Sequence, residues 1–414
     1  MYKAILGAAC AALISTSVLA VSQKADESTS KAPTQQSESA RANALFDDIF
    51  DRQVQRNPVR QTYLGIKDDY DKWNDLSEEA QAKELAHDKA DLALLRQVDT
   101  SKLDPSTLVS YRLFEQELMD DIADYKWRHH NYPVNQMFGE HAGIPAFLIN
   151  QHSIANVEEA EAYIARLEAV DTRLEQVVDQ LKIREEKGVI APDFVLPHVL
   201  RDSRNILSGA PFDGGEPSTL LADFSGKLAQ LDIPEADRTR LLREAELALL
   251  HSVQPGYQNL IAYLEELQNK ATADAGAWKL PEGEAYYRNR LQRITTTDLT
   301  AEEIHSIGLA EVKRIHAEMS AIADSVGFEG SLQEFMAFMR TDQQFYYPNT
   351  DAGREQYLDQ ADLVLAEIDQ RLDELFLVRP KADLDVKRVE EFREKSAGKA
   401  FYQQPAADGS RPGR

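Results

Sequence analysis

Apolar side chains recur at intervals of three and four residues along almost the whole chain, and this helical period restricts the fold more than any other feature. Between residues 42 and 54, six apolar side chains share one face of a helix: Ala42, Leu45, Phe46, Ile49, Phe50 and Val54. The same period predicts helices at 105–130, 156–188, 192–208, 217–231, 235–252, 256–272, 283–294, 301–326, 332–340 and 353–376. Alternation typical of strands is scarce, and its best candidate is the segment 384–386. We therefore expect an all-α protein with little or no sheet.

Capping residues mark the ends of several predicted helices. Asp104 before Pro105 is typical of a helix N-terminus, because the carboxylate accepts from free backbone N–H groups and proline needs no partner there. A Ser, Thr or Asn followed three residues later by Glu has the spacing of a capping box; the pairs are Asn156 with Glu159, Thr300 with Glu303, and Ser331 with Glu334. Glycines that can end helices are Gly188, Gly209 and Gly327.

The helices are unequal in length and show no repeat period, which favours an irregular multi-helix array over a solenoid. We predict a signal peptide at 1–20, a flexible polar linker at 21–40, a helical domain at 41–378 and an irregular tail at 379–414. The tail is dense in Pro, Gly and charge and finishes in a turn-forming run, DGSRPG. A turn with no following element suggests that the tail is the truncated start of a further part.

The first twenty residues have the pattern of an export signal. Lys3 precedes a stretch without charge, and the segment closes on Val18, Leu19 and Ala20, which signal peptidase could accept. We expect an exported, periplasmic or secreted protein with no integral membrane span after removal of the signal. Lipid attachment at Cys10, the only cysteine, is the alternative.

The charge balance is 46 basic against 70 acidic residues, a formal net charge of −24. A negative electrostatic field repels phosphate backbones, so we do not expect this protein to bind nucleic acid. Negative charge of this size also keeps an exported protein soluble.

The histidines do not form a zinc-binding motif. A zinc site without cysteine is most often built from two histidines one helical turn apart, as in HExxH. None of the nine histidines precedes a Glu, and no two are three or four residues apart. Their recurrent spacing of eleven separates two rings on one helix by about 16 Å, too far to share an ion. We predict neither a metal ligand nor a catalytic residue in this chain.

Four segments resemble the bacterial family known as domain of unknown function 885, a helical group placed among gluzincin-like metallopeptidases. They are GIPAFLINQHSIANVEEAEAYIARLEAV (143–170), GVIAPDFVLPHVL (188–200), EAYYRNRLQRITTTDLTAEEIHSIGLAEVKRIHAEM (284–319) and AFYQQPAADGSRPG (400–413). The third segment is the most specific, because it is a long run of residues that resembles the family in the same order. The resemblance extends from about residue 40 to residue 413.

The resemblance implies a zinc-dependent peptidase for full-length relatives, which carry an HExxPGHH-type motif beyond the DGSRPG segment. It also implies that this chain forms the metallopeptidase-like helical half of a cleft. No position here matches the motif, so zinc is expected only in full-length relatives. What the resemblance carries over is a substrate-cleft wall formed by Asp408, Gly409 and Arg411, although these residues could equally form a plain turn.

Two functions from different classes follow. The chain is either a truncated peptidase-family member that is inactive as it stands, or a non-catalytic periplasmic protein that binds peptides or other ligands. In both cases peptides are the expected partners. Helices that lack their packing partners would also expose apolar faces, so we expect a tendency to self-associate.

Overall fold

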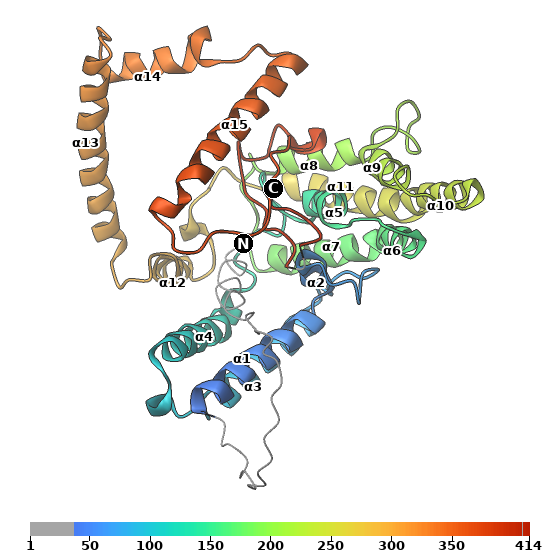
Figure 1. Ribbon diagram of the computed structural model, residues 1–414, viewed down its shortest axis with the longest axis horizontal. Helices are drawn as coiled ribbons and strands as arrows, with labels where there is room; N and C mark the ends of the chain where they lie inside the picture. The colour runs from blue at the N-terminus through green and yellow to red at the C-terminus, as the bar shows by residue number, and fades with distance from the viewer. Residues whose placement is uncertain (1–36, 408) are drawn as a thin grey trace, which may run out of the picture. The chain divides into compact units, whose positions relative to one another are not determined.

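The computed structural model describes residues 37–407 and 409–414, and over these residues the protein is all-helical, with no strand (Figure 1). The predicted signal peptide, Cys10 and nearly all of the predicted linker lie outside the described residues. The α-helices are α1 (Glu38–Gln55), α2 (Pro58–Leu64), α3 (Glu78–Leu95), α4 (Pro105–Asp124), α5 (Glu140–Gln151), α6 (Val157–Glu168), α7 (Val170–Glu186), α8 (Leu196–Ile206), α9 (Thr219–Leu228), α10 (Glu235–Ala248), α11 (Gln254–Gln268), α12 (Gly283–Thr295), α13 (Ala301–Ser325), α14 (Leu332–Thr341) and α15 (Asp351–Arg371). The first helix begins three residues before the predicted start of the helical domain at 41, because Ser37 accepts from the Ala40 N–H and caps it. No helix of the described chain is both long and apolar enough to span a membrane.

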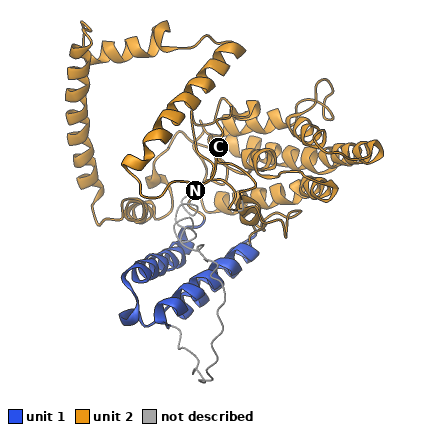
Figure 2. Cartoon of the chain, in the orientation of Figure 1, with its two compact units in different colours: residues 1–56, 77–128 blue, residues 57–76, 129–414 orange. Residues whose placement is uncertain are grey.

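The chain divides into two compact units (Figure 2). The first contains residues 1–56 and 77–128, with α1, α3 and α4. Its small core consists of Ala42, Leu95, Val98, Tyr111 and Leu118. The second contains residues 57–76 and 129–414, so the predicted tail belongs to the same unit as α5 to α15.

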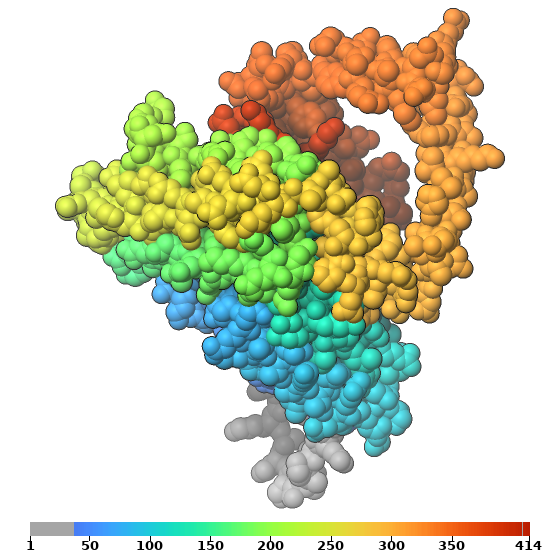
Figure 3. Space-filling model, turned by 180° about the vertical axis from the view of Figure 1, so that it is seen from behind, coloured from blue at the N-terminus to red at the C-terminus, as the bar shows by residue number. Residues whose placement is uncertain are grey.

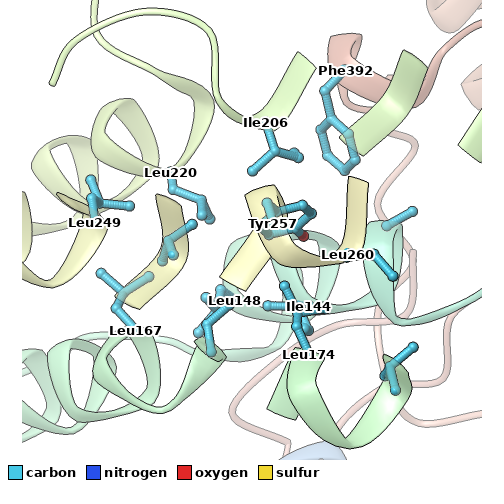
Figure 4. Packing of buried hydrophobic residues seen from close by; sticks show 14 of the residues in the cluster. Ile144, Leu148, Leu167, Leu174, Ile206, Leu220, Leu249, Tyr257, Leu260 and Phe392 are labelled. Carbon is cyan, nitrogen blue, oxygen red and sulfur yellow. The ribbon is translucent and has the colours of Figure 1, made fainter. Parts of the chain in front are cut away.

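The large core of the second unit lies among α5 to α11. The helices α7 and α8 both pack against α11, and α6 packs against α10. Side chains from these helices interdigitate around Tyr257, which is fully buried (Figure 4). Phe392, from the tail, completes this cluster.

The predicted helix starts are confirmed by the hydrogen bonds of their caps. Asp104 accepts from the Thr107 N–H at 2.9 Å, and Asn156 accepts from the Glu159 N–H at 2.8 Å. The two capping boxes at the starts of α13 and α14 are fully formed, with reciprocal bonds between cap and glutamate. Gly188, Gly209 and Gly327 all have positive φ, as helix-ending glycines do.

The predicted helix at 156–188 is two helices, α6 and α7, divided at Ala169. At this point the Asp171 N–H donates to Ser252 Oγ at 3.0 Å instead of to its own helix. A Cβ on Gly256 would lie 2.9 Å from the Asp171 Cα, so only glycine lets α11 approach this closely. Close packing therefore decides the break, through residues about 80 positions away.

The helices α2, α3 and α5 were not predicted. In α5, eight of twelve residues are buried, so no apolar stripe stands out against a polar face. It also contains Pro145, which argues against a helix when the sequence is read locally. Conversely, the predicted helices at 235–252 and 256–272 are continuous, because α10 and α11 are joined by a π-helical turn, Leu249–Val253.

Candidate functional site

The tail, residues 379–414, forms short extended segments that pair with one another. The Gly413 N–H donates to the Asp383 carbonyl at 2.9 Å, and the Asp385 N–H donates back to the Gly413 carbonyl at 2.8 Å. Gln403 and Arg414 exchange two backbone hydrogen bonds. The predicted strand at 384–386 is thus reduced to a single bridge between Leu384 and Gly413.

Arg411 fixes the turn of the tail to the end of α2. Its side chain is buried, with 7% of its surface exposed. The guanidinium donates to the Gln404 carbonyl at 2.8 Å and to the Tyr63 carbonyl at 3.1 Å. The Ala407 N–H adds a bond of 3.2 Å to the Leu64 carbonyl. Arg411 and the Ala407 N–H therefore each satisfy one carbonyl at the C-terminus of α2, where a cation is favoured.

Gly409, another residue of the predicted cleft wall, belongs to the same turn. Gly409 has φ of 77° and donates its N–H to the Ala406 carbonyl at 3.1 Å. This left-handed conformation favours glycine. Asp408 lies outside the described residues. For the described residues of this turn, the geometry is that of a structural anchor.

The tail is also anchored on α5 and α8. On α5, Arg414 Nη1 donates to the Asn150 carbonyl at 3.0 Å, and Gln151 Nε2 donates to Gln403 Oε1 at 3.0 Å. On α8, Asn205 Nδ2 donates to the Phe392 carbonyl at 3.1 Å. Three helices of the second unit thus hold the tail.

A second anchor on α8 combines Asp202, Arg201 and Ser396. The buried Asp202 carboxylate accepts from Arg201 Nε at 2.9 Å and from the Ser396 hydroxyl. Arg201 Nη2 donates to Ser396 Oγ at 3.0 Å. The Ser396 hydroxyl is held by both Asp202 and Arg201, so it links the tail to α8.

A buried cation, Arg166 on α6, organises the region where α2, α5 and α6 meet. It donates through Nη1 to His152 Nδ1 at 3.0 Å, through Nη2 to Thr62 Oγ1 at 2.8 Å, and through Nε to the Lys72 carbonyl at 3.1 Å. Aromatic rings surround it, those of Tyr70, Trp73 and Phe147, with centroids 4.9 to 5.5 Å from the guanidinium carbon. Burial lowers the pKa of Arg166 to about 10, so it stays charged at neutral pH.

His152 is held as a neutral ring by this network. The Glu159 carbonyl can only accept, so His152 Nε2 carries the proton and donates to it at 3.0 Å. Nδ1 then accepts from Arg166. Burial, followed by the nearby Arg166 charge, keeps the pKa of His152 well below its usual value. Both ring nitrogens are occupied, so His152 is not available to a metal.

His141, in the first turn of α5, is also buried. Burial lowers its pKa to about 4, although the nearby Asp202 carboxylate acts in the opposite direction. Its Nδ1 has no hydrogen-bond partner. The Asp202 oxygens are taken by Arg201 and Ser396, so His141 and Asp202 do not form a free ligand pair.

The described residues do not fit the zinc ion that the resemblance implies for full-length relatives. Within the described part of the chain, no group of three or more His, Cys, Asp or Glu side chains could hold a metal ion. His130 Nε2 donates to the Pro281 carbonyl at 2.9 Å. His305 and His316 lie exposed on α13, eleven residues apart. No chemistry that passes through a metal is therefore derived for these residues.

Two open pockets lie in the second unit. One, of about 450 Å³, is lined by α6 and the segment 67–71, with Asp71, Glu158 and Glu161 among its walls. The other, of about 580 Å³, lies between the loop 208–217 and tail residues 391–395, with Asp213 and Lys395 among its walls. Most of the charged residues that line the two pockets are acidic, and neither lining contains a histidine or a cysteine.

The second unit also contains the arm, which we define as residues 301–378 with α13, α14 and α15. On α13 and α15 together, only Ala323 and Gly353 are buried. Large apolar side chains are exposed on both helices: Ile307, Leu309, Val312, Ile315, Ile322, Tyr357, Leu363, Val364 and Ile368. In the space-filling view the atoms of these helices surround an open space (Figure 3). Exposed apolar surface on this scale is typical of an interaction site.

The helices of the arm were predicted from sequence, but their exposure was not. Periodicity shows that a helix has an apolar face, and a buried face is the ordinary outcome. We did predict that helices without packing partners would expose apolar faces, but that prediction did not say which helices. The arm is therefore the candidate surface that the structure adds.

Two solved structures resemble this one. A provisionally designated lipoprotein from Colwellia psychrerythraea matches with a TM-score of 0.79 at 20% identity, over 91% of this chain and 67% of that one. A provisionally designated lipoprotein of unknown function from Shewanella oneidensis matches with a TM-score of 0.51 at 16% identity, over 86% of this chain and 61% of that one. At these identities the likeness shows the fold alone. This chain therefore spans about two thirds of the length of the first protein and about three fifths of the second.

No curated protein matches the chain. The family model of DUF885, described as a bacterial protein of unknown function, matches residues 58–414. This range contains the second unit apart from its first residue, Asn57, with the arm and the anchored tail, as well as α3 and α4. The chain belongs to the DUF885 family of bacterial proteins.

Proposed function

We propose that this chain is the peptide-binding, helical part of an exported zinc-peptidase-type protein, and that its own residues bind peptides without hydrolysing them. The observation that carries the proposal is the exposed apolar surface of the arm, on a unit that otherwise has a well-packed core. Hydrolysis by the zinc mechanism would need metal ligands and a general base, which the HExxPGHH-type motif of the resembling peptidases supplies.

Three further points support the proposal. The DUF885 match agrees with the family that the four sequence segments resemble. The resemblance to that family is what implies a peptidase. The sequence has no HExxH motif. The two solved relatives are provisionally designated lipoproteins, a class of exported proteins, which agrees with export of this chain.

The test combines binding with cleavage. The purified chain is titrated with a library of fluorescent peptides, and the same peptides are incubated with the chain and added Zn²⁺ and analysed by mass spectrometry. We expect saturable binding and intact peptides. Zinc-dependent cleavage would refute the non-catalytic part of the proposal, and a lack of binding across the library would refute peptide recognition.

A double variant of the arm distinguishes peptide binding at the arm from non-specific binding to any exposed apolar residues. Ile315→Gln with Ile322→Gln removes apolar side chains from the exposed face of α13. The matched control is Val109→Gln with Leu113→Gln, which removes two exposed apolar side chains from α4 in the first unit. We expect the arm variant to weaken peptide binding and the control to leave it unchanged.

A further inference from the structure

The arm carries far more negative charge than its length accounts for. Residues 301–378 contain 5 basic against 16 acidic residues, a net charge of −11. The other 336 residues contain 41 basic against 54 acidic residues, a net charge of −13. A fifth of the chain thus holds almost half of its excess negative charge.

Most of the arm's positive charge is already neutralised within this region. Arg314 pairs with Glu311 at 2.8 Å and with Glu318 at 2.7 Å. Arg354 pairs with Asp351, and Arg371 with Glu374, both at 3.0 Å. On α15, by contrast, four carboxylates take part in no ion pair in the described structure: Glu355, Asp359, Asp362 and Glu367.

The apolar side chains of the arm form continuous faces on its helices. On α13, Val312, Ile315 and Ile322 are spaced by three and seven residues, so they share one face. On α15, Tyr357, Val364 and Ile368 are spaced by seven and four and share a face as well. Asp359 and Asp362 are three residues apart on a different side of the same helix, where they add negative potential to the surface.

This combination selects a particular occupant. A partner that covers the arm must offer an apolar face, and it must carry positive charge to offset the −11 of the arm. A second copy of the arm offers the apolar face but carries the same negative charge, so the two would repel each other. A basic amphipathic helix provides both properties.

We propose that the arm binds cationic, amphipathic peptides that fold as helices against the apolar faces of α13 and α15. The inference rests on the proposed peptide-binding function and names the substrate class of that surface. The proposal requires the bound peptide to be positively charged, whereas an apolar patch alone would bind peptides of either charge.

The experiment uses model peptides of one design. A 20-residue peptide with leucine at helical spacing and lysine elsewhere is compared with a peptide in which glutamate replaces every lysine, and with a scrambled lysine peptide that has no apolar face. Binding to the full chain is measured by fluorescence anisotropy at low and at high salt. We expect the lysine peptide to bind about tenfold or more tightly than the other two, with affinity that falls as salt rises.

Two arm variants and one control locate the binding surface. Ile315→Gln with Ile322→Gln removes apolar contacts, and Asp359→Asn with Asp362→Asn removes two unpaired charges. The control is Val109→Gln with Leu113→Gln on α4. Far-UV circular dichroism checks that each variant stays helical. We expect both arm variants to weaken lysine-peptide binding several-fold, the second mainly at low salt, with no change in the control.

The outcomes separate this inference from the proposed function. Equal binding of the lysine and glutamate peptides, or loss in the control as large as in the arm variants, overturns the inference while peptide binding stands. No binding of any peptide in this set or in the library overturns both. A dimer in light scattering that the Ile315 and Ile322 changes convert to monomer, without peptide binding, would assign the face to a second copy instead.

Discussion

At the scale of single residues, the notable feature is a pair of histidines that the fold keeps uncharged. His152 accepts from the guanidinium of Arg166, and a proton on its Nδ1 would remove this bond and place two cations together. His141 is buried, with 2% of its surface exposed, and its Nδ1 has no hydrogen-bond partner. Both side chains therefore make folding sensitive to pH.

We predict that the free energy of unfolding falls as the pH drops from about 6.5 toward 4. An unfolded histidine binds a proton near its ordinary pKa of about 6.5. Folded His141 binds one only near a pKa of about 4, and folded His152 has a pKa well below its usual value. Below pH 6.5 the unfolded state binds more protons, so stability is present above this pH and is lost as the pH decreases; His141 alone accounts for about 3 kcal/mol.

Urea denaturation at pH 7.5, 5.5 and 4.5 measures this loss. His141→Phe should reduce the pH dependence and leave the part that His152 contributes, because only one of the two titrating residues is removed. His305→Gln, on exposed α13, should leave the dependence as it is. A stability that is constant between pH 7.5 and 4.5 would contradict the assignment of both histidines as neutral core residues.

At the scale of elements, the tail is the least regular segment, yet it is attached to the best-packed part of the chain. Phe392 enters the core of the second unit with 5% of its surface exposed, next to helices α8 and α11 (Figure 4). Polar anchors surround it, from Asn205 to the Phe392 carbonyl and from Asp202 to Ser396. The tail is held by one aromatic side chain and a set of hydrogen bonds.

We predict that Phe392→Ala lowers the free energy of unfolding by about 3 kcal/mol, because it leaves a cavity where a phenyl ring filled the core. The same change should release the tail, so limited proteolysis should cut between residues 379 and 414 sooner than in the unmodified protein. The control is Phe401→Ala, in the same tail but half-exposed. If both variants are cut at the same rate, the tail is not held by Phe392.

At the scale of the whole molecule, the proposal of export concerns residues 1–20, which lie outside the described structure. We predict cleavage after Ala20, so that the exported protein begins at Val21. Intact-mass spectrometry of protein from the periplasmic fraction measures this. Cys10→Ser should change neither the mass of the product nor its fractionation. A lipid-modified Cys10 at the N-terminus, lost in that variant together with membrane association, would establish the lipoprotein alternative.

Whether a feature of the molecule could be predicted depends on how far apart along the chain the interacting residues lie. Caps at Asp104, Asn156, Thr300 and Ser331 depend on residues three positions apart, so they could be predicted from the sequence, and the structure confirms them. The contacts of the candidate site residues could not be predicted in this way. Asp408, Gly409 and Arg411 were singled out by resemblance as a cleft wall or a plain turn, and the cleft wall stays a prediction. The bond from Arg411 to the carbonyl of Tyr63, 348 residues away along the chain, is seen only in the structure.

By itself, the sequence determined the helical class, most helix positions and the likeness to one family, because periodicity, caps and segment wording are local properties of the chain. Tertiary structure decided the rest: the break between α6 and α7, the buried cation Arg166, the anchoring of the tail, and the exposure of the arm. Each of these depends on partners tens to hundreds of residues away, or on a covering surface that the described chain does not place there. Burial is a property of packing, and a helical pattern shows which face is apolar without showing what covers it.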